Sequence, residues 1–297
     1  MSQHVMEEMD ALRRGIAAIA ADLPGRLGVC VRYPHDDVGV GLAADDLFPA
    51  ASVIKIPIMV ETYRQAAAGL LSLDDPLPVL AEELADGSGV LRYLHPGLPL
   101  TVADAVELMI IVSDNTATNL LIRRLGADAV NLAMDELGFA RTRTAGPIRA
   151  ANADVPLARM SRTTPREMCG LLSLLATGAL VSADASAAMI ATLEHQLYGD
   201  MLPRHLPLTY YPERLGLDEM PVRIAHKTGG LSGVRNDVGI VRAQTPAGVR
   251  TMLFSAFTAD LADEELWTVE NVGARAVAAA ARLAYDTLLR LATISAA

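Results

Sequence analysis

The sequence is short of aromatic residues and of positive charge. Phe, Trp and Tyr together make up 4% of its 297 residues, and 25 Lys and Arg face 35 Asp and Glu, which gives a net charge of −10. Proteins that bind nucleic acids cluster their cations to neutralise phosphates, and many stack bases on aromatic side chains. We therefore expect no nucleic-acid partner.

Cysteine is scarce and long apolar runs are missing. Cys30 and Cys169 lie far apart and show no metal-ligand spacing, so we expect two small buried thiols, no metal and no cofactor. Residues 1–14 lack the basic start and the apolar stretch of a signal peptide, and no segment approaches the roughly 18 apolar residues of a membrane span. We expect no membrane partner. We expect a cytoplasmic protein as the sequence is written, or a secreted or periplasmic one if a leader was trimmed.

The composition that remains is that of a globular chain, with 52% hydrophobic and 20% charged residues. Apolar periodicity predicts strands near both ends of the chain and helices between them. The predicted strands are 26–33, 38–42, 222–227, 238–242 and 250–258, and the predicted helices are 6–23, 52–71, 101–112, 117–125, 127–137, 164–176, 183–193 and 272–292. Strands from the two ends can share a sheet only if the helical block is an insertion between them.

This order predicts an α/β fold in a single domain, residues 1–297. An α/β lobe comes from about 1–51 and 194–297, and an all-helical lobe comes from about 52–193. Ligand sites favour the seam between such lobes, so we expect a small-molecule substrate to bind there.

Lysine is the rarest of the charged residues. Only Lys55 and Lys227 occur, and the other basic residues are arginines. Arginine keeps its proton in proteins, whereas a buried lysine can lose it and act as a base. Ser52 precedes Lys55 by three residues at the start of a predicted helix, so the two side chains share one face. This pattern suits a serine nucleophile beside an amine base.

Two further motifs follow Ser52 and Lys55 along the chain. Ser-Asp-Asn occupies 113–115 directly after a predicted helix, and Lys-Thr-Gly occupies 227–229 at the end of a predicted strand. Each motif alone is more typical of a cap or a turn. Together with Ser-x-x-Lys at 52–55, they form the signature of class A β-lactamases and penicillin-binding proteins.

The sequence resembles the class A β-lactamase-type serine hydrolases from about residue 27 to the C-terminal helix. Residues 48–52, 113–121, 162–165 and 235–238 are also similar to segments of that family. The resemblance implies an α+β fold, with an antiparallel sheet flanked by helices and an all-α lobe. It implies a hydrolase that opens a β-lactam amide through an acyl-enzyme. An esterase, transacylase or peptidase acting on another acyl group, or a slowly deacylating penicillin-binding-like protein, remains an alternative.

The resemblance also assigns roles to the catalytic residues. Ser52 attacks the carbonyl carbon and Lys55 takes its proton. Ser113 relays a proton to the leaving nitrogen, and Lys227 assists that transfer electrostatically. Asn115 holds Lys55 and a substrate amide.

The resemblance further implies an oxyanion hole made by the backbone N–H groups of Ser52 and Gly230. The residues expected to bind substrate are Thr228, Gly229, Arg235 and Tyr93. Thr228 and Arg235 are expected to hold a substrate carboxylate, and Arg235 does so best if it is bidentate. The alternatives are a solvent-exposed strand residue for Arg235 and a packed loop residue for Tyr93.

The omega loop departs from the family pattern. Ile148 stands where the family has the glutamate that activates the deacylating water, and the loop contains no glutamate. Gly146 and Ser161 occupy the positions of the ion pair that usually closes this loop. Asp154 is the only carboxylate in the loop, so it is the expected substitute base, although an aspartate in a loop is more often a turn former.

The segment 194–220 is longer and more aromatic than the family's usual connection, with Tyr198, Tyr210 and Tyr211. It either covers the site and selects the acyl group, or it is an inert surface insertion.

Overall fold

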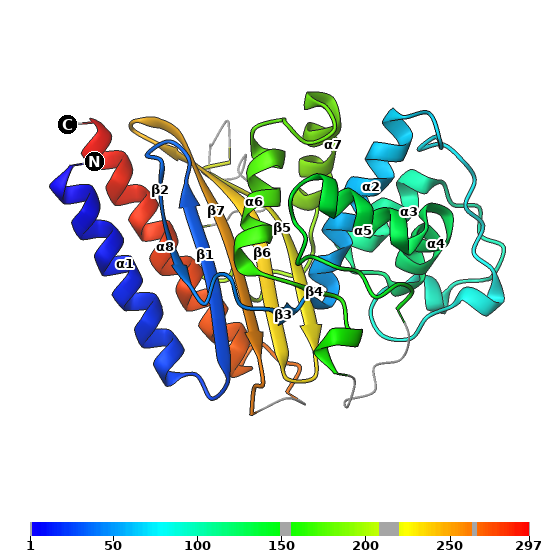
Figure 1. Ribbon diagram of the computed structural model, residues 1–297, viewed down its shortest axis with the longest axis horizontal. Helices are drawn as coiled ribbons and strands as arrows, with labels where there is room; N and C mark the ends of the chain where they lie inside the picture. The colour runs from blue at the N-terminus through cyan, green and yellow to red at the C-terminus, as the bar shows by residue number, and fades with distance from the viewer. Residues whose placement is uncertain (1, 149–155, 208–219, 263–265, 297) are drawn as a thin grey trace.

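The computed structural model describes residues 2–148, 156–207, 220–262 and 266–296. Its centre is an antiparallel sheet in the order β2-β1-β7-β6-β5 (Figure 1). The strands are β1 Arg26–Tyr33, β2 Val38–Leu42, β5 Val222–Leu231, β6 Val234–Thr245 and β7 Gly248–Ala259. The N-terminal hairpin pairs with β7 from the far end of the chain, as the sequence predicts.

Local patterns predict β1 and β2 to the residue, but they underestimate the C-terminal strands. β6 begins at Val234 and not at residue 238, because the two residues Ser232 and Gly233 suffice to turn the chain out of β5. Gly233 adopts a φ of +67°, which residues other than glycine rarely adopt. The extension carries Arg235 and Asn236 into the sheet, opposite Gly230 and Gly229.

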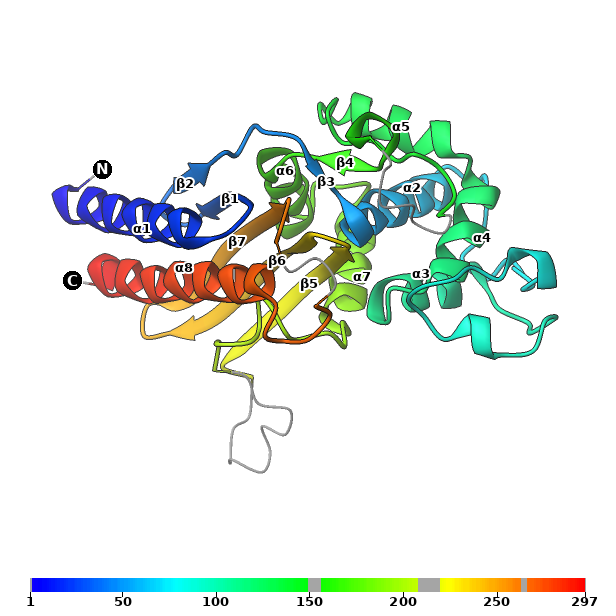
Figure 2. The ribbon, with the colours of Figure 1, turned by 90° about the horizontal axis from the view of Figure 1, so that it is seen from below.

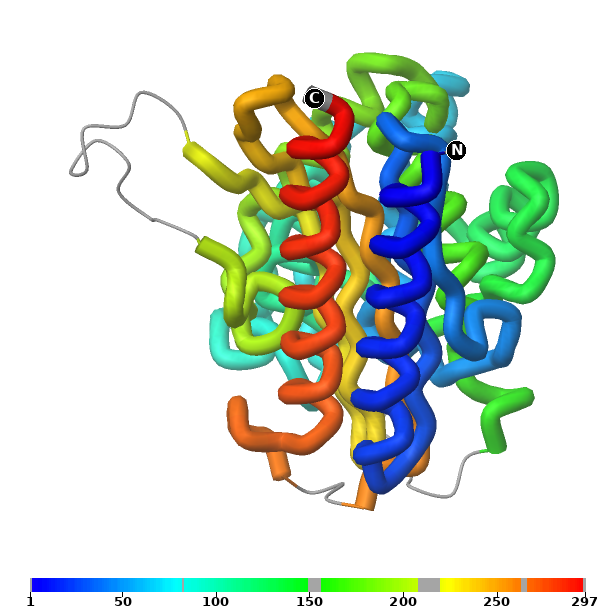
Figure 3. The backbone as a smooth tube through the Cα atoms, turned by 90° about the vertical axis from the view of Figure 1, so that its left-hand side faces the viewer, coloured from blue at the N-terminus to red at the C-terminus, as the bar shows by residue number. Residues whose placement is uncertain are grey.

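Two long helices cover one face of the sheet. α1, Gln3–Asp22, and α8, Val272–Ala296, lie side by side, and both chain ends lie at the same end of this pair (Figure 3). Ile16 and Val277 are fully buried in a core cluster that also contains Val29 and Phe254 from the central strands. The two ends of the chain therefore close one half of the hydrophobic core.

The helices from the middle of the chain lie on the other side of the sheet (Figure 2). They are α2 Lys55–Ala67, α3 Val102–Ile111, α4 Asn115–Leu125, α5 Ala127–Glu136, α6 Pro165–Ala176 and α7 Ala183–Glu194. Thr101 caps α3 by accepting the Asp104 N–H, and Asp104 bonds back to the Thr101 N–H, which confirms the predicted cap. α6 packs against β1 and β7, while α2 to α5 extend beyond β5, the sheet's edge strand.

None of the helices in the described part of the chain has the length and apolar character needed to cross a bilayer.

Candidate active site

Ser52 lies in a 3₁₀ turn, Ala51–Ile54, that leads directly into α2. The residue before it, Ala51, has a φ of +46°, in the left-handed region that costs a non-glycine residue about 1–2 kcal/mol. Such backbone strain persists only where the surroundings hold it, and it concentrates at functional sites. The turn therefore presents Ser52 in a conformation that its own sequence does not favour.

The contacts that hold this turn come from distant segments. The short strand β3, Phe48–Pro49, pairs with β4, Arg162–Thr163, and the Ala50 N–H donates to the Ser161 carbonyl at 2.8 Å. From β6, the buried Asn236 side chain donates to the Pro49 carbonyl at 2.9 Å. The sequence motifs gave no role to Asn236, because its partner lies on a strand far away in the chain.

Lys55 is fully buried at the start of α2, and its amine is surrounded by hydrogen-bond acceptors. Its Nζ donates to the Ser113 carbonyl at 2.7 Å, to Ser113 Oγ at 3.0 Å and to Asn115 Oδ1 at 2.9 Å. Burial lowers the pKa of Lys55 well below its usual value, and the positive charge of Lys227 lowers it further. Both effects favour the neutral form of the amine, which is the form that can accept a proton, while the carboxylate of Asp114 opposes them.

Lys227 lies on β5, where strand alternation turns it and Ala225 away from α8 and toward the helical lobe. Its side chain is fully buried, and Nζ donates to the Thr228 carbonyl at 2.9 Å. Burial lowers the pKa of Lys227 to about 7, while the nearby carboxylate of Asp237 opposes that shift. Asp237 is itself buried and accepts hydrogen bonds from His226 and from the Leu202 N–H.

The Ser-Asp-Asn segment links α3 to α4 in a tightly specified shape. Ser113 has a φ of +54°, and Asp114 caps α4 by accepting the Ala117 N–H at 2.9 Å. The other carboxylate oxygen of Asp114 accepts the N–H groups of Val90 and Leu91. Because three backbone donors converge on one buried carboxylate, Ser113 and its neighbours are fixed in place.

A glycine-rich loop packs directly against this segment. Ser88 Oγ donates to the Ser113 carbonyl at 2.7 Å, and the Asn115 N–H donates to the Ser88 carbonyl at 3.0 Å. A Cβ at Gly89 would come within 2.3 Å of Asp114 side-chain atoms, and one at Gly87 within 2.7 Å of Asn115. Glycine is required at both positions for this close approach.

The strand end that follows Lys227 lies against the nucleophile turn. A Cβ at Gly229 would lie 3.2 Å from the Ser52 nitrogen and 3.1 Å from the Ala50 carbonyl oxygen. β5 is an edge strand, so one side of its backbone faces away from the sheet. The arrangement brings the Ser52 backbone beside the segment that contains Gly230, as an oxyanion hole requires.

Arg235 does not extend freely into solvent. Its side chain donates to the carbonyls of Leu231, Val234 and Leu266, each at 2.7 Å, and its guanidinium stacks on the Trp267 ring at 4.2 Å. Three N–H groups of the guanidinium are thereby bonded to backbone carbonyls. The positive charge can still attract a substrate carboxylate, but those groups are already engaged.

Trp267 is the single tryptophan of the chain, and it lies at this end of the sheet. Its indole is 61% exposed, and its ring edge lies 3.2 Å from the point where a Cβ on Gly230 would stand. No sequence motif identifies Trp267, because its proximity to Gly230 arises only from the return of the chain before α8.

Two tyrosines named from the sequence differ in their surroundings. Tyr93 is 75% exposed, and the guanidinium of Arg92 lies over its ring. Tyr198 donates from its hydroxyl to the Val112 carbonyl at 3.2 Å, directly before Ser113. The other two, Tyr210 and Tyr211, lie outside the described residues.

The start of the omega loop is anchored on α4. Asn119 accepts the Ile148 N–H at 2.7 Å and donates to the Ile148 carbonyl at 2.9 Å. Both polar groups of the Asn119 side chain are thus hydrogen-bonded to the backbone of Ile148, whose own side chain is aliphatic. Asp154, the expected substitute base, lies outside the described residues.

The neck of this loop is closed by hydrogen bonds at the position where the sequence shows no ion pair. Arg143 and Arg162 pair as an isolated antiparallel bridge, and the Ala145 N–H donates to Ser161 Oγ at 3.0 Å.

Among the described residues, no three His, Cys, Asp or Glu side chains are placed to hold a metal ion.

Comparisons with known proteins agree with this geometry. A family model described as the beta-lactamase enzyme family matches residues 11–288. Beta-lactamase L2 of Stenotrophomonas maltophilia is 28% identical over 227 residues, which cover 76% of this chain and 71% of that protein.

Solved structures show the same similarity over nearly the whole chain. A β-lactamase from Sphaerobacter thermophilus DSM 20745 is 34% identical with a TM-score of 0.80, covering 94% of this chain and 97% of that one. A mutant of PBP-A, solved as an acyl-enzyme complex with penicillin G, is 25% identical with a TM-score of 0.75, covering 94% and 96%.

Proposed function

The chain belongs to the β-lactamase enzyme family, and we propose that it is a serine hydrolase that opens a β-lactam amide through an ester on Ser52. The observation that carries this proposal is the buried amine of Lys55. It lies one helical turn after Ser52 and within hydrogen-bond distance of Ser113 Oγ and Asn115 Oδ1. The only other lysine in the sequence is Lys227.

The first step is attack of Ser52 Oγ on the lactam carbonyl carbon. The neutral amine of Lys55 accepts the hydroxyl proton, and the carbonyl oxygen becomes an oxyanion facing the N–H groups of Ser52 and Gly230. A donor of this kind contributes about 3–4 kcal/mol to transition-state stability in serine hydrolases. The strained turn at Ala51 holds the first of these N–H groups in place.

The second step breaks the bond between the carbonyl carbon and the lactam nitrogen. The proton held by Lys55 passes through Ser113 Oγ, 3.0 Å away, to the departing nitrogen. The protonated form of Lys227 favours this transfer by stabilising negative charge near Ser113. The product of the step is an ester between Ser52 and the opened ring.

Substrate binding uses the strand end and the loops around it. We assign the substrate carboxylate to Thr228 and to the positive charge of Arg235, which is 5% exposed and fixed by backbone carbonyls. Gly229 and Gly230 let the substrate approach the backbone of β5, and the exposed ring of Tyr93 offers a stacking surface.

Hydrolysis of the ester is the slow step of the proposed β-lactamase reaction. Water must be deprotonated beside the ester, and the residue that Asn119 fixes beside α4 is Ile148, whose side chain cannot accept a proton. Asp154 is the substitute base that we assign. A relative of similar fold, a PBP-A mutant, is known as an acyl-enzyme with penicillin G, which supports an ester of this kind here.

A fluorescent penicillin tests the proposal. The wild-type protein should become covalently labelled, and Ser52→Ala, which lacks the attacking hydroxyl, should not. A chromogenic cephalosporin added to the same samples should be hydrolysed by the wild type and not by Ser52→Ala. Labelling that survives in Ser52→Ala would contradict the assignment. Activity on short esters without any reaction with either β-lactam would favour the esterase alternative.

A further inference from the structure

The two cysteines of the chain, far apart in sequence, meet in the fold. Cys30 lies on β1 and Cys169 lies on α6, and both side chains are buried in one core cluster where α6 packs on the sheet. Each cysteine is the largest cause of the shift in the pKa of the other, so the two thiols lie close together. Two cysteines brought together from different elements form a dithiol, which oxidation can close to a disulfide.

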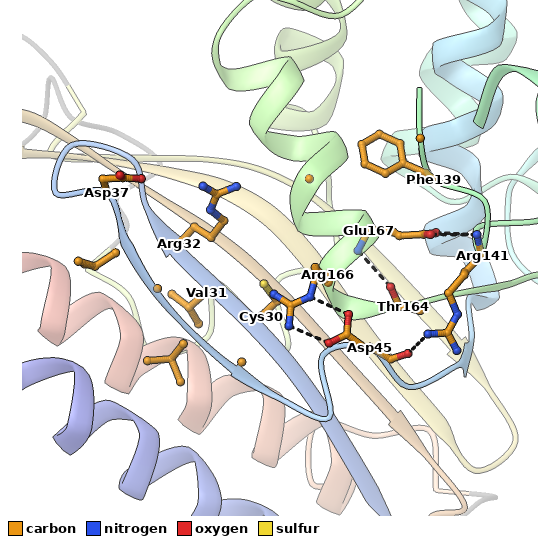
Figure 4. Close-up of a pocket in the computed structure, with 16 residues that line it drawn as sticks. Cys30, Val31, Arg32, Asp37, Asp45, Phe139, Arg141, Thr164, Arg166 and Glu167 are labelled. Carbon is orange, nitrogen blue, oxygen red and sulfur yellow. Dashed lines mark hydrogen bonds and ion pairs between the residues drawn. The ribbon is translucent and has the colours of Figure 1, made fainter. Parts of the chain in front are cut away.

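Of the two cysteines, Cys30 lines a cavity that the described residues form. A cavity of about 650 Å³ lies between the hairpin β1–β2 and α6, and its lining includes Cys30 but not Cys169 (Figure 4). Cys169 is fully buried behind it. A reagent that enters this cavity therefore meets Cys30 first.

Charged side chains surround the cavity mouth, and two of them are unpaired. Arg166 is held by Asp45 through two hydrogen bonds, of 2.7 and 2.8 Å, beside the Cys30 sulfur (Figure 4). Arg32 and Asp37 also line the cavity, and within the described residues neither side chain forms a hydrogen bond or an ion pair. One free cation and one free anion suit a zwitterionic ligand, with a carboxylate toward Arg32 and an ammonium toward Asp37.

The surroundings divide the two thiols chemically. The hydrogen bond from Cys169 lowers the pKa of Cys30, and the positive charges of Arg166 and Arg32 add to that effect against its burial. The same hydrogen bond and burial raise the pKa of Cys169 well above its usual value. The thiolate, which is the reactive form, therefore resides on Cys30, on the side of the cavity.

We propose that Cys30 and Cys169 form a thiol modification site that exchanges with a small zwitterionic disulfide entering the cavity between β1–β2 and α6. The Cys30 thiolate attacks one sulfur of the reagent, whose S–S bond breaks, and the departing thiolate takes a proton from water. A mixed disulfide remains on Cys30.

Cys169 then resolves this adduct. Its thiol gives its proton to water, its sulfur attacks Cys30 Sγ, and the second half of the reagent leaves as a thiolate that becomes protonated. Two protein thiols are oxidised to one disulfide, and one reagent disulfide is reduced to two thiols. The resulting bond joins β1 to α6. This helix directly follows β4, which pairs with β3, the strand that precedes the Ser52 turn.

Oxidised glutathione is the probe, since it is a disulfide that carries free α-amino and α-carboxylate groups. Incubation of the folded wild type should remove two hydrogens from the intact mass, and a non-reduced peptide map should link Cys30 to Cys169. The melting temperature should rise, and dithiothreitol should reverse both changes. Cys169→Ser should stop at one glutathione on Cys30, whereas Cys30→Ser should stay unmodified.

A neutral disulfide, hydroxyethyl disulfide, tests the assigned ligand class. Arg32→Ala should slow the reaction with oxidised glutathione severalfold and leave the rate with hydroxyethyl disulfide unchanged. Modification of Cys169 in the Cys30→Ser variant would overturn the order of attack. Equal reaction of both thiols only in denaturant would overturn the site itself. None of these readouts depends on reaction with a β-lactam, so they stand apart from the proposed function.

Discussion

The site contains two buried amines, and the proposed mechanism requires them in different protonation states. Lys55 must be neutral to accept the Ser52 proton, whereas Lys227 must be charged to assist the transfer through Ser113. Burial disfavours the charged form of both. The negative charge of Asp237 partly opposes the lowering of the Lys227 pKa, whereas for Lys55 the repulsion by Lys227 is a larger effect than the opposing charge of Asp114. The surroundings therefore separate the two roles.

Replacement of each lysine by arginine separates the same roles in an experiment. Lys55→Arg keeps the charge but cannot release its proton, so the acylation rate should fall by about 100-fold or more. Lys227→Arg should cost about tenfold or less, equivalent to about 1.4 kcal/mol, because its role is electrostatic. Stopped-flow acylation rates measure both. A Lys55→Arg variant that acylates at the wild-type rate would remove the general-base role.

The pH profile reports Lys227. Its pKa is about 7 in the folded protein, below its usual 10.5, so the charged form is lost as the pH rises through about 7. The value of kcat/KM for a β-lactam should therefore decline above that pH, since kcat/KM titrates groups of the free enzyme. In Lys227→Arg this alkaline limb should disappear, because arginine stays charged. The same limb in both proteins would assign it to another group.

Trp267 supplies a spectroscopic signal from the site. It is the single tryptophan, it is 61% exposed, and it lies beside Gly230. A bound β-lactam should exclude water from the indole and shift its emission to shorter wavelength. Ser52→Ala should show the shift on binding alone, and Trp267→Phe should show none. A mass-confirmed adduct on wild type without any change in emission would place the substrate away from Trp267.

At the scale of elements, the sequence predicts what depends on neighbouring residues. The hairpin 26–42 and the Thr101 cap follow from local alternation and capping chemistry, and the structure confirms both. The start of β6 and the grip of Asn236 on Pro49 depend on strands that meet only after folding. The proximity of Cys30 and Cys169 also arises only on folding. The sequence therefore predicts that both thiols are buried, but it does not predict that they meet.

The motif residues behave differently from these contacts. Lys55, Ser113 and Asn115 lie together as the resemblance to class A β-lactamases implies, because α2 packs against α3 and α4. Trp267 has no motif to mark it, and its place depends on the chain's return to β5.

The omega loop is the element in which a single change tests the account. Asn119 fixes the backbone of Ile148, so Ile148→Glu places a carboxylate on an anchored residue. Ester hydrolysis should accelerate about 100-fold if the carboxylate reaches the water, the typical range for a positioned general base. Ile148→Gln is the matched control, of similar size but unable to accept a proton. Equal rates of ester hydrolysis in the Ile148→Glu and Ile148→Gln variants would show that a carboxylate at position 148 does not act as the base.

At the scale of the whole molecule, the site lies where the two halves of the fold meet. The sheet, closed by α1 and α8 from the two chain ends, supplies Lys227 and Gly230, and the helices from the middle supply Ser52, Lys55 and Ser113 (Figure 1). Acylation needs only these groups, and all of them are in place. Deacylation needs a further base in the omega loop, which the described residues do not supply.

The measurement that tests this account most directly is a time course of intact mass after mixing the wild type with a penicillin. We predict that a species heavier by one penicillin forms quickly and decays slowly, and that peptide mapping places it on Ser52. Ser52→Ala should show no such species at any time. Rapid hydrolysis of the penicillin with no detectable adduct would contradict slow deacylation, and an adduct on any residue other than Ser52 would contradict the mechanism.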